Sequence, residues 1–161
     1  MRNVEYREIF AVCVFAVLSI FFQFETVQAE DMSSPVGVWR TYDEKTGEAK
    51  ALVEIREEFN AMFGRVVKLL PRPGRPPDPV CQFCGGDHKD QPILGMQVIW
   101  DMRKEGHEWV HGKILDPESG KIYSSKMWLE NEGKILVVRG FIGFSLLGRS
   151  QRWVREIGHS N

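Results

Sequence analysis

The sequence predicts an all-β fold, an antiparallel up-and-down barrel of eight strands. Short runs in which apolar and polar side chains alternate recur between residues 36 and 156, and turn residues separate them. No stretch after residue 30 repeats its apolar residues at the spacing of a helix. Eight strands in succession favour a barrel, because closing the sheet on itself removes the edge strands.

Residues 108–141 predict a three-stranded meander, because two turns separate three alternating runs. In the first turn, residues 116–120, Pro117 presets φ and Gly120 accepts a positive φ. Residues 130–133 offer a second turn of the same kind. The meander therefore consists of two hairpins.

The register of these hairpins decides which side chains face the barrel interior. We expect Leu115 to pair with Ile122, and Leu129 to pair with Lys134. Trp109 then lies on the outer face. The interior side chains predicted by this register are Val110, Gly112, Ile114, Tyr123, Ser125, Met127, Leu136, Val138 and Gly140.

The other strands lie on either side of the meander. We expect them at residues 36–42, 49–57, 63–70, 96–102 and 150–156. Residues 71–92 interrupt the pattern, because they hold most of the chain's prolines, and proline has no N–H to donate to a sheet. Loops as long as this Pro/Cys loop are usually binding loops, lids or disordered segments.

The first 29 residues predict a signal peptide. Residues 9–22 form an apolar run shorter than the roughly 20 residues that cross a bilayer as a helix. Ala29 ends a small-residue cleavage pattern, so the mature domain is expected at residues 30–161. An uncleaved membrane anchor is the alternative. Export to the periplasm or the medium follows from cleavage, and the mature chain has no further candidate transmembrane helix.

The charge of the chain excludes some classes of partner. The formal net charge is −1, and without the first 29 residues the basic and acidic residues are equal in number. A nucleic-acid-binding protein would show a basic excess, so nucleic acid is not expected as a partner.

Cys81-Gln82-Phe83-Cys84 is the strongest chemical motif in the chain. After removal of the first 29 residues an exported chain would keep two cysteines, which favours a disulfide between Cys81 and Cys84 that would stiffen the loop. Zinc bound by both cysteines, His88 and either Asp87 or Asp90 is an alternative, although the spacing matches no strong zinc pattern. A redox dithiol is a third hypothesis, and it is the least favoured because no helix follows the motif to lower a thiol pKa. We therefore expect no metal and no cofactor.

The sequence shows no catalytic constellation, and we do not expect an enzyme. Ser124 and Ser125 lack the glycines of a nucleophile elbow, and no histidine is paired with a nucleophile. The acidic pair Asp116 and Glu118 is explained by the turn in which it lies.

Residues 141–148 are apolar but interrupted by glycines. A loop that plugs one end of the barrel explains them most simply, since large exposed apolar patches are uncommon on monomers. A portal for an apolar ligand and a homodimer contact are the alternatives.

Four motifs carry a resemblance to known families. They are Gly37-Val38-Trp39, Cys81-x-x-Cys84-Gly85, Asp116-Pro117-x-x-Gly120-Lys121-x-Tyr123, and Arg139-Gly140-x-x-Gly143 followed by Gln151-x-Trp153-x-Arg155. Together they resemble domain of unknown function 2147, a family of exported bacterial proteins without a stated activity, and the first and last are similar to the lipocalin or calycin signature. The resemblance implies a lipocalin-like barrel whose floor is built by Gly37, Trp39 and Arg155, with Arg152 as the substitute arginine.

The functional hypothesis is an exported binding protein for a small apolar or amphipathic molecule. Gly112, Ser125 and Val138 form the middle row of the interior face, and small side chains there would leave a hollow. The expected ligand-binding residues are Met96, Trp100, Gly112, Tyr123, Ser125, Met127, Leu136 and Val138. The alternative is a structural or interaction protein of the cell envelope that acts through its surface loops.

Overall fold

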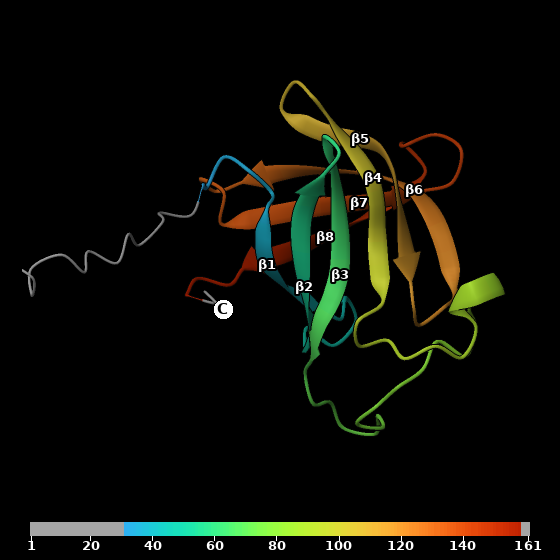
Figure 1. Cartoon of the computed structure of the whole chain (residues 1–161). Coiled ribbons are helices and arrows are strands. Elements are labelled where there is room, and N and C mark those ends of the chain that lie inside the picture. The colour runs from blue at the N-terminus through green and yellow to red at the C-terminus, as the bar shows by residue number, and fades with distance from the viewer. Residues whose placement is uncertain (1–30, 159–161) are drawn as a thin grey trace, which may run out of the picture. The chain divides into compact units, whose positions relative to one another are not determined.

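The structure, a computed structural model, describes residues 31–158 and shows them as a closed antiparallel barrel (Figure 1). Each strand pairs with the next in sequence, and the last pairs with the first. The strands are β1 (Gly37–Tyr42), β2 (Ala49–Glu58), β3 (Ala61–Leu69), β4 (Gln97–Glu105), β5 (Glu108–Asp116), β6 (Lys121–Glu130), β7 (Ile135–Phe141) and β8 (Gly148–Arg155). The predicted eight-stranded barrel is confirmed. The signal peptide predicted for residues 1–29 lies outside the described residues.

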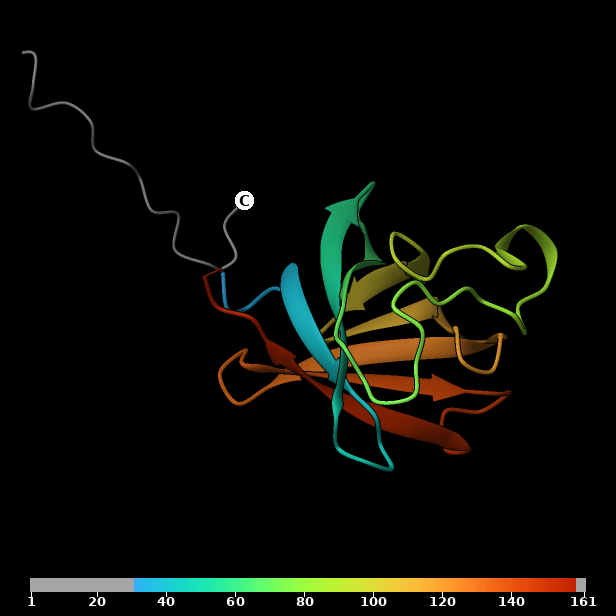
Figure 2. The ribbon, with the colours of Figure 1, turned by 90° about the horizontal axis from the view of Figure 1, so that it is seen from below.

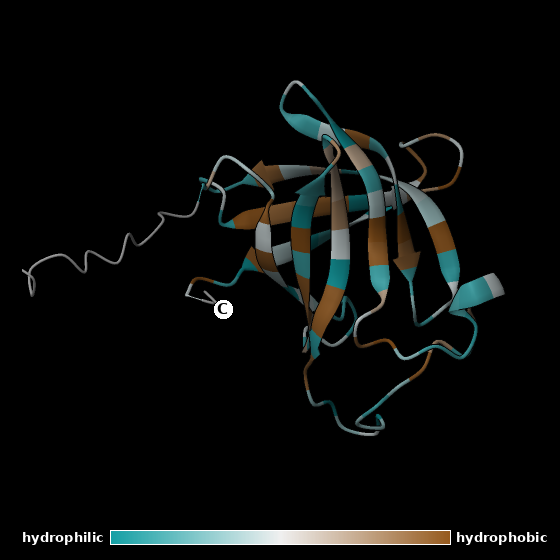
Figure 3. Cartoon of the chain, viewed as in Figure 1, coloured by the Kyte–Doolittle hydropathy of each residue, from teal (hydrophilic) through white to brown (hydrophobic). Residues whose placement is uncertain are grey.

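Alternation of side chains along the strands builds the core of the barrel. Figure 3 shows hydrophobic and hydrophilic residues following one another along the ribbons, as one buried face and one solvated face require. The largest fully buried side chains include Trp39, Ile55, Ile99, Met102, Met127 and Leu136.

A bulge in β5 changes the predicted interior face. His111 has a φ of 62°, and the pairing with β6 passes from Trp109↔Met127 to Gly112↔Ser125. One extra residue in β5 therefore moves Trp109 to the interior, where it is 3% exposed, and turns Val110 outward. The prediction that placed Val110 inside and Trp109 outside was wrong.

A second bulge, in β4, changes the position of Trp100. Asp101 has a φ of 55°, and Trp100 pairs with the exposed Lys113 on the outer face. Ile99, not Trp100, points inward, and the Trp100 ring lies 5.7 Å from the ring of His88 in the long loop. The predicted interior position of Trp100 was wrong, because strict alternation does not allow for an extra residue.

The β6–β7 hairpin has a wider turn than expected. Leu129 pairs with Leu136 instead of Lys134, because Asn131 and Glu132 both adopt positive φ and lengthen the turn. The shift of two residues keeps every side chain on its predicted face. It also places Gly140, not Val138, beside Ser125. The predicted pairing of Leu115 with Ile122 is confirmed.

Trp39 and Arg155 close one end of the barrel. The guanidinium of Arg155 lies over the Trp39 ring, with 4.2 Å between its Cζ atom and the ring centroid. It donates hydrogen bonds to the carbonyl oxygens of Gly133, Val36 and Ser34 at 2.7–2.8 Å. These contacts join the N-terminal segment, the β6–β7 turn and β8.

The Arg155→Met variant is expected to lower the free energy of unfolding by about 3–5 kcal/mol, because the buried carbonyl group of Gly133 and two partly buried carbonyl groups lose a charged donor. Urea denaturation measures this change. Arg152→Met is the control, since Arg152 is exposed and pairs with Glu130 on the surface, and it should change stability by less than about 1 kcal/mol. Equal effects of the two variants would contradict the role assigned to Arg155.

Candidate functional site

The middle of the barrel is filled by the protein's own side chains. Ser125, Met127 and Leu136 are completely buried, and Val138 nearly so. A Cβ atom added to Gly112 would lie 2.6 Å from Cγ of Met102, so the space that Gly112 leaves is occupied. The prediction that small residues in this row leave a hollow was wrong there, because the space left by a small residue is available to any neighbouring side chain.

Besides Trp100 on the outer face, two of the predicted ligand-binding residues lie outside this packed middle. Tyr123 faces inward near the long-loop end of the barrel and keeps partial exposure. Met96 precedes β4 and is buried, and its carbonyl oxygen accepts a hydrogen bond from the N–H of Val66. Met96 therefore contributes to the core where the long loop joins the barrel.

A hollow of about 240 Å³ lies at the opposite end of the barrel, at the β2–β3 and β4–β5 turns. The N-terminal segment borders it on another side. The lining residues are Asp31, Ser33, Ser34, Glu57, Asn60, Met62, Lys104 and Trp109. Another hollow, of about 280 Å³, lies among mostly charged and polar side chains of β2, β3 and β4. The first hollow is the better candidate for a ligand, because it reaches buried apolar residues of the barrel.

Trp109 gives this hollow an unusual chemical property. Its indole Nε1 is buried, yet it has no hydrogen-bond partner among the described residues. A buried donor without a partner costs about 1–3 kcal/mol, and nearly all buried polar groups in proteins are paired. The other tryptophan donors with described partners, in Trp39, Trp128 and Trp153, bond to oxygen atoms. The N–H of Trp109 thus lacks an acceptor among the described residues, and Trp109 itself lines the hollow.

The charges around the hollow are mixed. The Lys104 ammonium lies 5.5 Å from the centroid of the Trp109 ring, and Asp31 and Glu57 add two carboxylates. Hydrogen bonds from the hydroxyl and the N–H of Ser33 hold the pKa of Asp31 below its ordinary value, so this carboxylate stays ionised. One cation and two anions favour a neutral or zwitterionic ligand over a simple anion.

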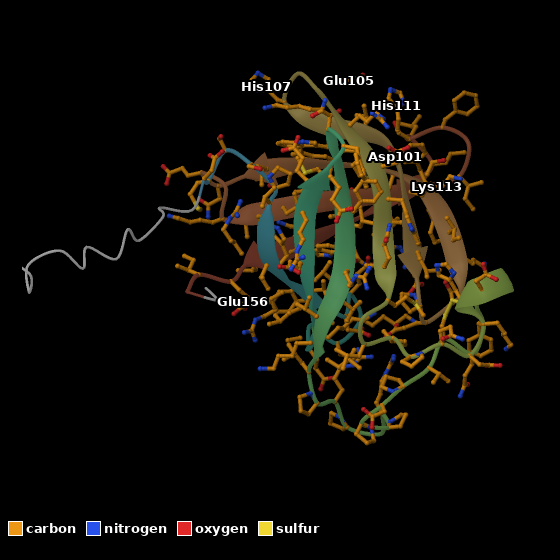
Figure 4. All side chains as sticks on the ribbon, viewed as in Figure 1. Asp101, Glu105, His107, His111, Lys113 and Glu156 are labelled. Atoms are coloured by element: carbon orange, nitrogen blue, oxygen red, sulfur yellow. A yellow bond between two sulfur atoms is a disulfide. The ribbon has the colours of Figure 1, made fainter. Side chains whose placement is uncertain are left out.

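The polar residues on the outer surface of β4 and β5 do not form a comparable site. Figure 4 shows Glu105 and His107 at the tip of the β4–β5 turn, with His111 close by. His111 Nε2 lies 2.9 Å from a carboxylate oxygen of Glu105, and both side chains are more than 60% exposed. Within residues 31–158, no group of three or more histidine, cysteine or acidic residues is arranged to hold a metal ion.

The long loop between β3 and β4 is tied to the β5–β6 turn. Cys81 and Cys84 form a disulfide, which confirms that prediction and leaves no thiolate for zinc. Cys81 lies against the carbonyl oxygen of Pro117, and a Cβ atom on Gly120 would come within 1.9 Å of the carbonyl oxygen of Phe83. Both sulfur-bearing residues are buried, so the disulfide is part of the packed interior of the loop.

Ion pairs hold the same end of the barrel together. Arg72, in the loop, bonds to Asp43 in the β1–β2 turn and to Glu118 in the β5–β6 turn. Partial burial would raise the pKa of Glu118, but its interactions with Lys50 and two arginines outweigh burial and leave this pKa below its ordinary value. Ion pairs therefore link the β1–β2 turn, the long loop and the β5–β6 turn to one another.

The segment between β7 and β8 does not plug the barrel. The side chains of Ile142, Phe144, Leu146 and Leu147 are between 70% and 87% exposed. The prediction of a buried plug was wrong, because the segment forms a projecting loop, in which Gly143 adopts a φ of 71°.

These observations define the protein as a lipocalin-like barrel. The fold is similar to that of protein HP1028 from Helicobacter pylori, a solved structure described as belonging to the lipocalin family. The two chains share 15% sequence identity and superpose with a TM-score of 0.65 over 76% of this chain and 83% of the other. At this identity the likeness concerns the fold.

The chain belongs to the DUF2147 family, described as uncharacterised proteins conserved in bacteria, whose model matches residues 37–155. A comparison with curated proteins gave no match. Along residues 31–158, no helix is long and apolar enough to span a bilayer.

The sequence did not reveal the residues of the hollow. Met62 precedes the strand predicted at residues 63–70, so the strand pattern did not include it. Asn60 and Glu57 lie in or beside a turn, where polar residues are expected in any case. Five tryptophans are a usable signal, since a buried tryptophan needs an acceptor for its N–H, but only the structure shows which one lacks it.

The charged end of the barrel predicts a pH dependence of stability. Hydrogen bonds from the backbone N–H groups of Lys45 and Thr46, with Arg72 assisting, lower the pKa of Asp43 to about 2 from 3.8. A depressed folded-state pKa stabilises the fold above pH 3.8, and this contribution is lost as the pH falls from 3.8 through about 2. Asp43→Asn keeps the turn acceptor but removes the charge, so its melting temperature should fall less steeply over that interval than that of the wild type. Identical slopes in thermal melts would show that Asp43 makes no such contribution.

Proposed function

We propose that this chain is an exported lipocalin-like binding protein that takes a small amphipathic molecule in the hollow beside Trp109. The observation that supports this proposal most directly concerns Trp109, which lines the hollow. Its buried Nε1 has no hydrogen-bond partner among residues 31–158. A ligand with a hydrogen-bond acceptor would satisfy this donor while its apolar part packs against Met62 and the indole ring. Binding, not catalysis, is what the site offers.

The size of the hollow restricts the ligand. Its volume of about 240 Å³ lies just below the usual range of ligand pockets, about 300–1,000 Å³, so one or two rings or a short chain would fit. The ligand should carry an acceptor and no net negative charge, because two carboxylates share the site with one ammonium group. A long-chain lipid held along the barrel axis is not expected, since the middle of the barrel is packed.

Two probes of similar shape test the role of the indole donor. Coumarin has a carbonyl acceptor, and naphthalene has none. We expect coumarin to shift the indole N–H resonance of Trp109 in ¹H–¹⁵N spectra and naphthalene to shift it much less. The Trp109→Phe variant identifies this resonance by its absence and should bind coumarin about fivefold more weakly, the effect of one hydrogen bond of about 1 kcal/mol.

Trp128→Phe is the matched control, because the N–H of Trp128 is already bonded to Glu130. This variant should bind both probes as the wild type does. Binding of coumarin that is unchanged by Trp109→Phe, or no perturbation of Trp109 by either probe at millimolar concentration, would overturn the proposal for this hollow.

A role as an interaction protein of the cell envelope is the second candidate. The observation in its favour is the projecting loop between β7 and β8, whose four large apolar side chains are mostly exposed. Most monomeric soluble proteins avoid such a concentration of exposed apolar side chains. This role does not exclude ligand binding, because the loop and the hollow lie at different ends of the barrel.

Export gives a prediction of its own. Cleavage after Ala29 would produce a mature chain that begins at Glu30, and the disulfide between Cys81 and Cys84 suits an oxidising compartment. Mass spectrometry of the protein recovered from the periplasm or the medium of a bacterial host should show this N-terminus. Recovery of the uncleaved chain in the membrane fraction would instead identify residues 1–29 as an anchor.

A further inference from the structure

We propose that the β7–β8 loop, residues 142–147, inserts its apolar side chains into the surface of a lipid bilayer. This inference rests on the surface-interaction role and not on the ligand-binding role. Ile142, Phe144, Leu146 and Leu147 are each at least 70% exposed within a single turn of chain. Figure 1 shows the loop projecting from the barrel beyond the ends of β7 and β8.

The backbone of the loop is prepared for an apolar environment. Arg139 donates hydrogen bonds from Nε to the carbonyl oxygen of Ser145 at 2.7 Å, and from Nη2 to that of Leu146 at 3.2 Å. The N–H of Leu147 bonds to the carbonyl oxygen of Phe144 at 3.0 Å. Unpaired backbone groups are the main cost of placing a loop among lipid chains, and these bonds reduce it.

The charges beside the loop fit the headgroup region of a membrane. Arg139 and Arg149 stand at its two ends, and Lys113 projects from the neighbouring outer face (Figure 4). The Arg149 side chain is 78% exposed and pairs with Glu44 at 3.3 Å, a contact weak enough to exchange for a lipid phosphate. Apolar tips with basic residues at their base are the arrangement that favours interfacial binding.

The size and shape of the loop argue against a second copy of the chain as its partner. A stable protein interface buries about 800 Å² and some 20–30 residues on each side. Here only four large side chains, on a projecting turn, are apolar. A bilayer requires no complementary surface, so a small tip is sufficient for weak, reversible attachment.

Vesicle co-sedimentation tests this inference with the chain that starts at Glu30, since all eight strands lie after that residue. One set of vesicles contains phosphatidylethanolamine with phosphatidylglycerol, and the other contains phosphatidylcholine alone. We expect binding to both, with tighter binding to the first because of the arginines. The double variant Phe144→Ser/Leu146→Ser should partition at least about tenfold more weakly, because it lacks two large apolar side chains that move from water into the bilayer in the wild type.

The control removes the same kind of apolar side chain elsewhere. Phe59 and Ile157 are 92% and 73% exposed, and they lie toward the other end of the barrel. The control variant Phe59→Ser/Ile157→Ser should therefore change partitioning into vesicles by less than about twofold. Equal loss in both double variants, or no sedimentation of the wild type, would overturn the inference. Detection by light scattering of a wild-type dimer that dissociates in the Phe144→Ser/Leu146→Ser variant would also overturn the inference. The coumarin-induced shift of Trp109 should survive in that variant, so failure of one proposal is distinguishable from failure of the other.

Discussion

The closure of the sheet between β1 and β8 is the constraint on which the rest of the molecule depends. These strands share only two paired positions, Trp39↔Arg155 and Arg40↔Val154, whereas β7 and β8 share a full strand length. Side chains make up for the short backbone ladder, because Arg155 bonds to three carbonyl groups and Arg40 pairs with Glu156. Figure 2 shows β1 beside β8 where the sheet closes. Without this contact the barrel would be an open sheet with two exposed edges.

Once the barrel is closed, two bulges decide which side chains fill its interior. The extra residue at His111 turns Trp109 inward, and the extra residue at Asp101 turns Trp100 outward. Met102 then fills the space beside Gly112, so the middle of the barrel is packed while the end near Trp109 keeps a hollow. Bulges commonly redirect side chains next to functional sites. The unpaired indole N–H is therefore a product of backbone geometry, and a regular strand would have placed it in water.

Sequence patterns predicted the barrel, its strand order, the disulfide and most of its interior face. Such patterns record alternation, and alternation is the property that a sheet requires of every strand. The patterns did not predict the bulges at His111 and Asp101, because a polar residue is compatible both with an exposed strand position and with a bulge. They also failed at residues 142–147, where hydrophobicity alone does not distinguish a buried plug from an exposed tip. The candidate site was missed because its key property, a donor without an acceptor, exists only in three dimensions.

The up-and-down topology separates two kinds of chemistry. Successive connections alternate between the ends of the barrel, so the β2–β3 and β4–β5 turns lie at one end and the long loop, the β5–β6 turn and the β7–β8 loop lie at the other. The first end has the hollow with its unpaired donor, and the second has the disulfide, the ion-pair network and the apolar tip. Attachment of the tip to a bilayer would direct the opposite end, and the hollow within it, away from the lipid. A small molecule could then enter from the aqueous phase while the protein stays on the membrane surface.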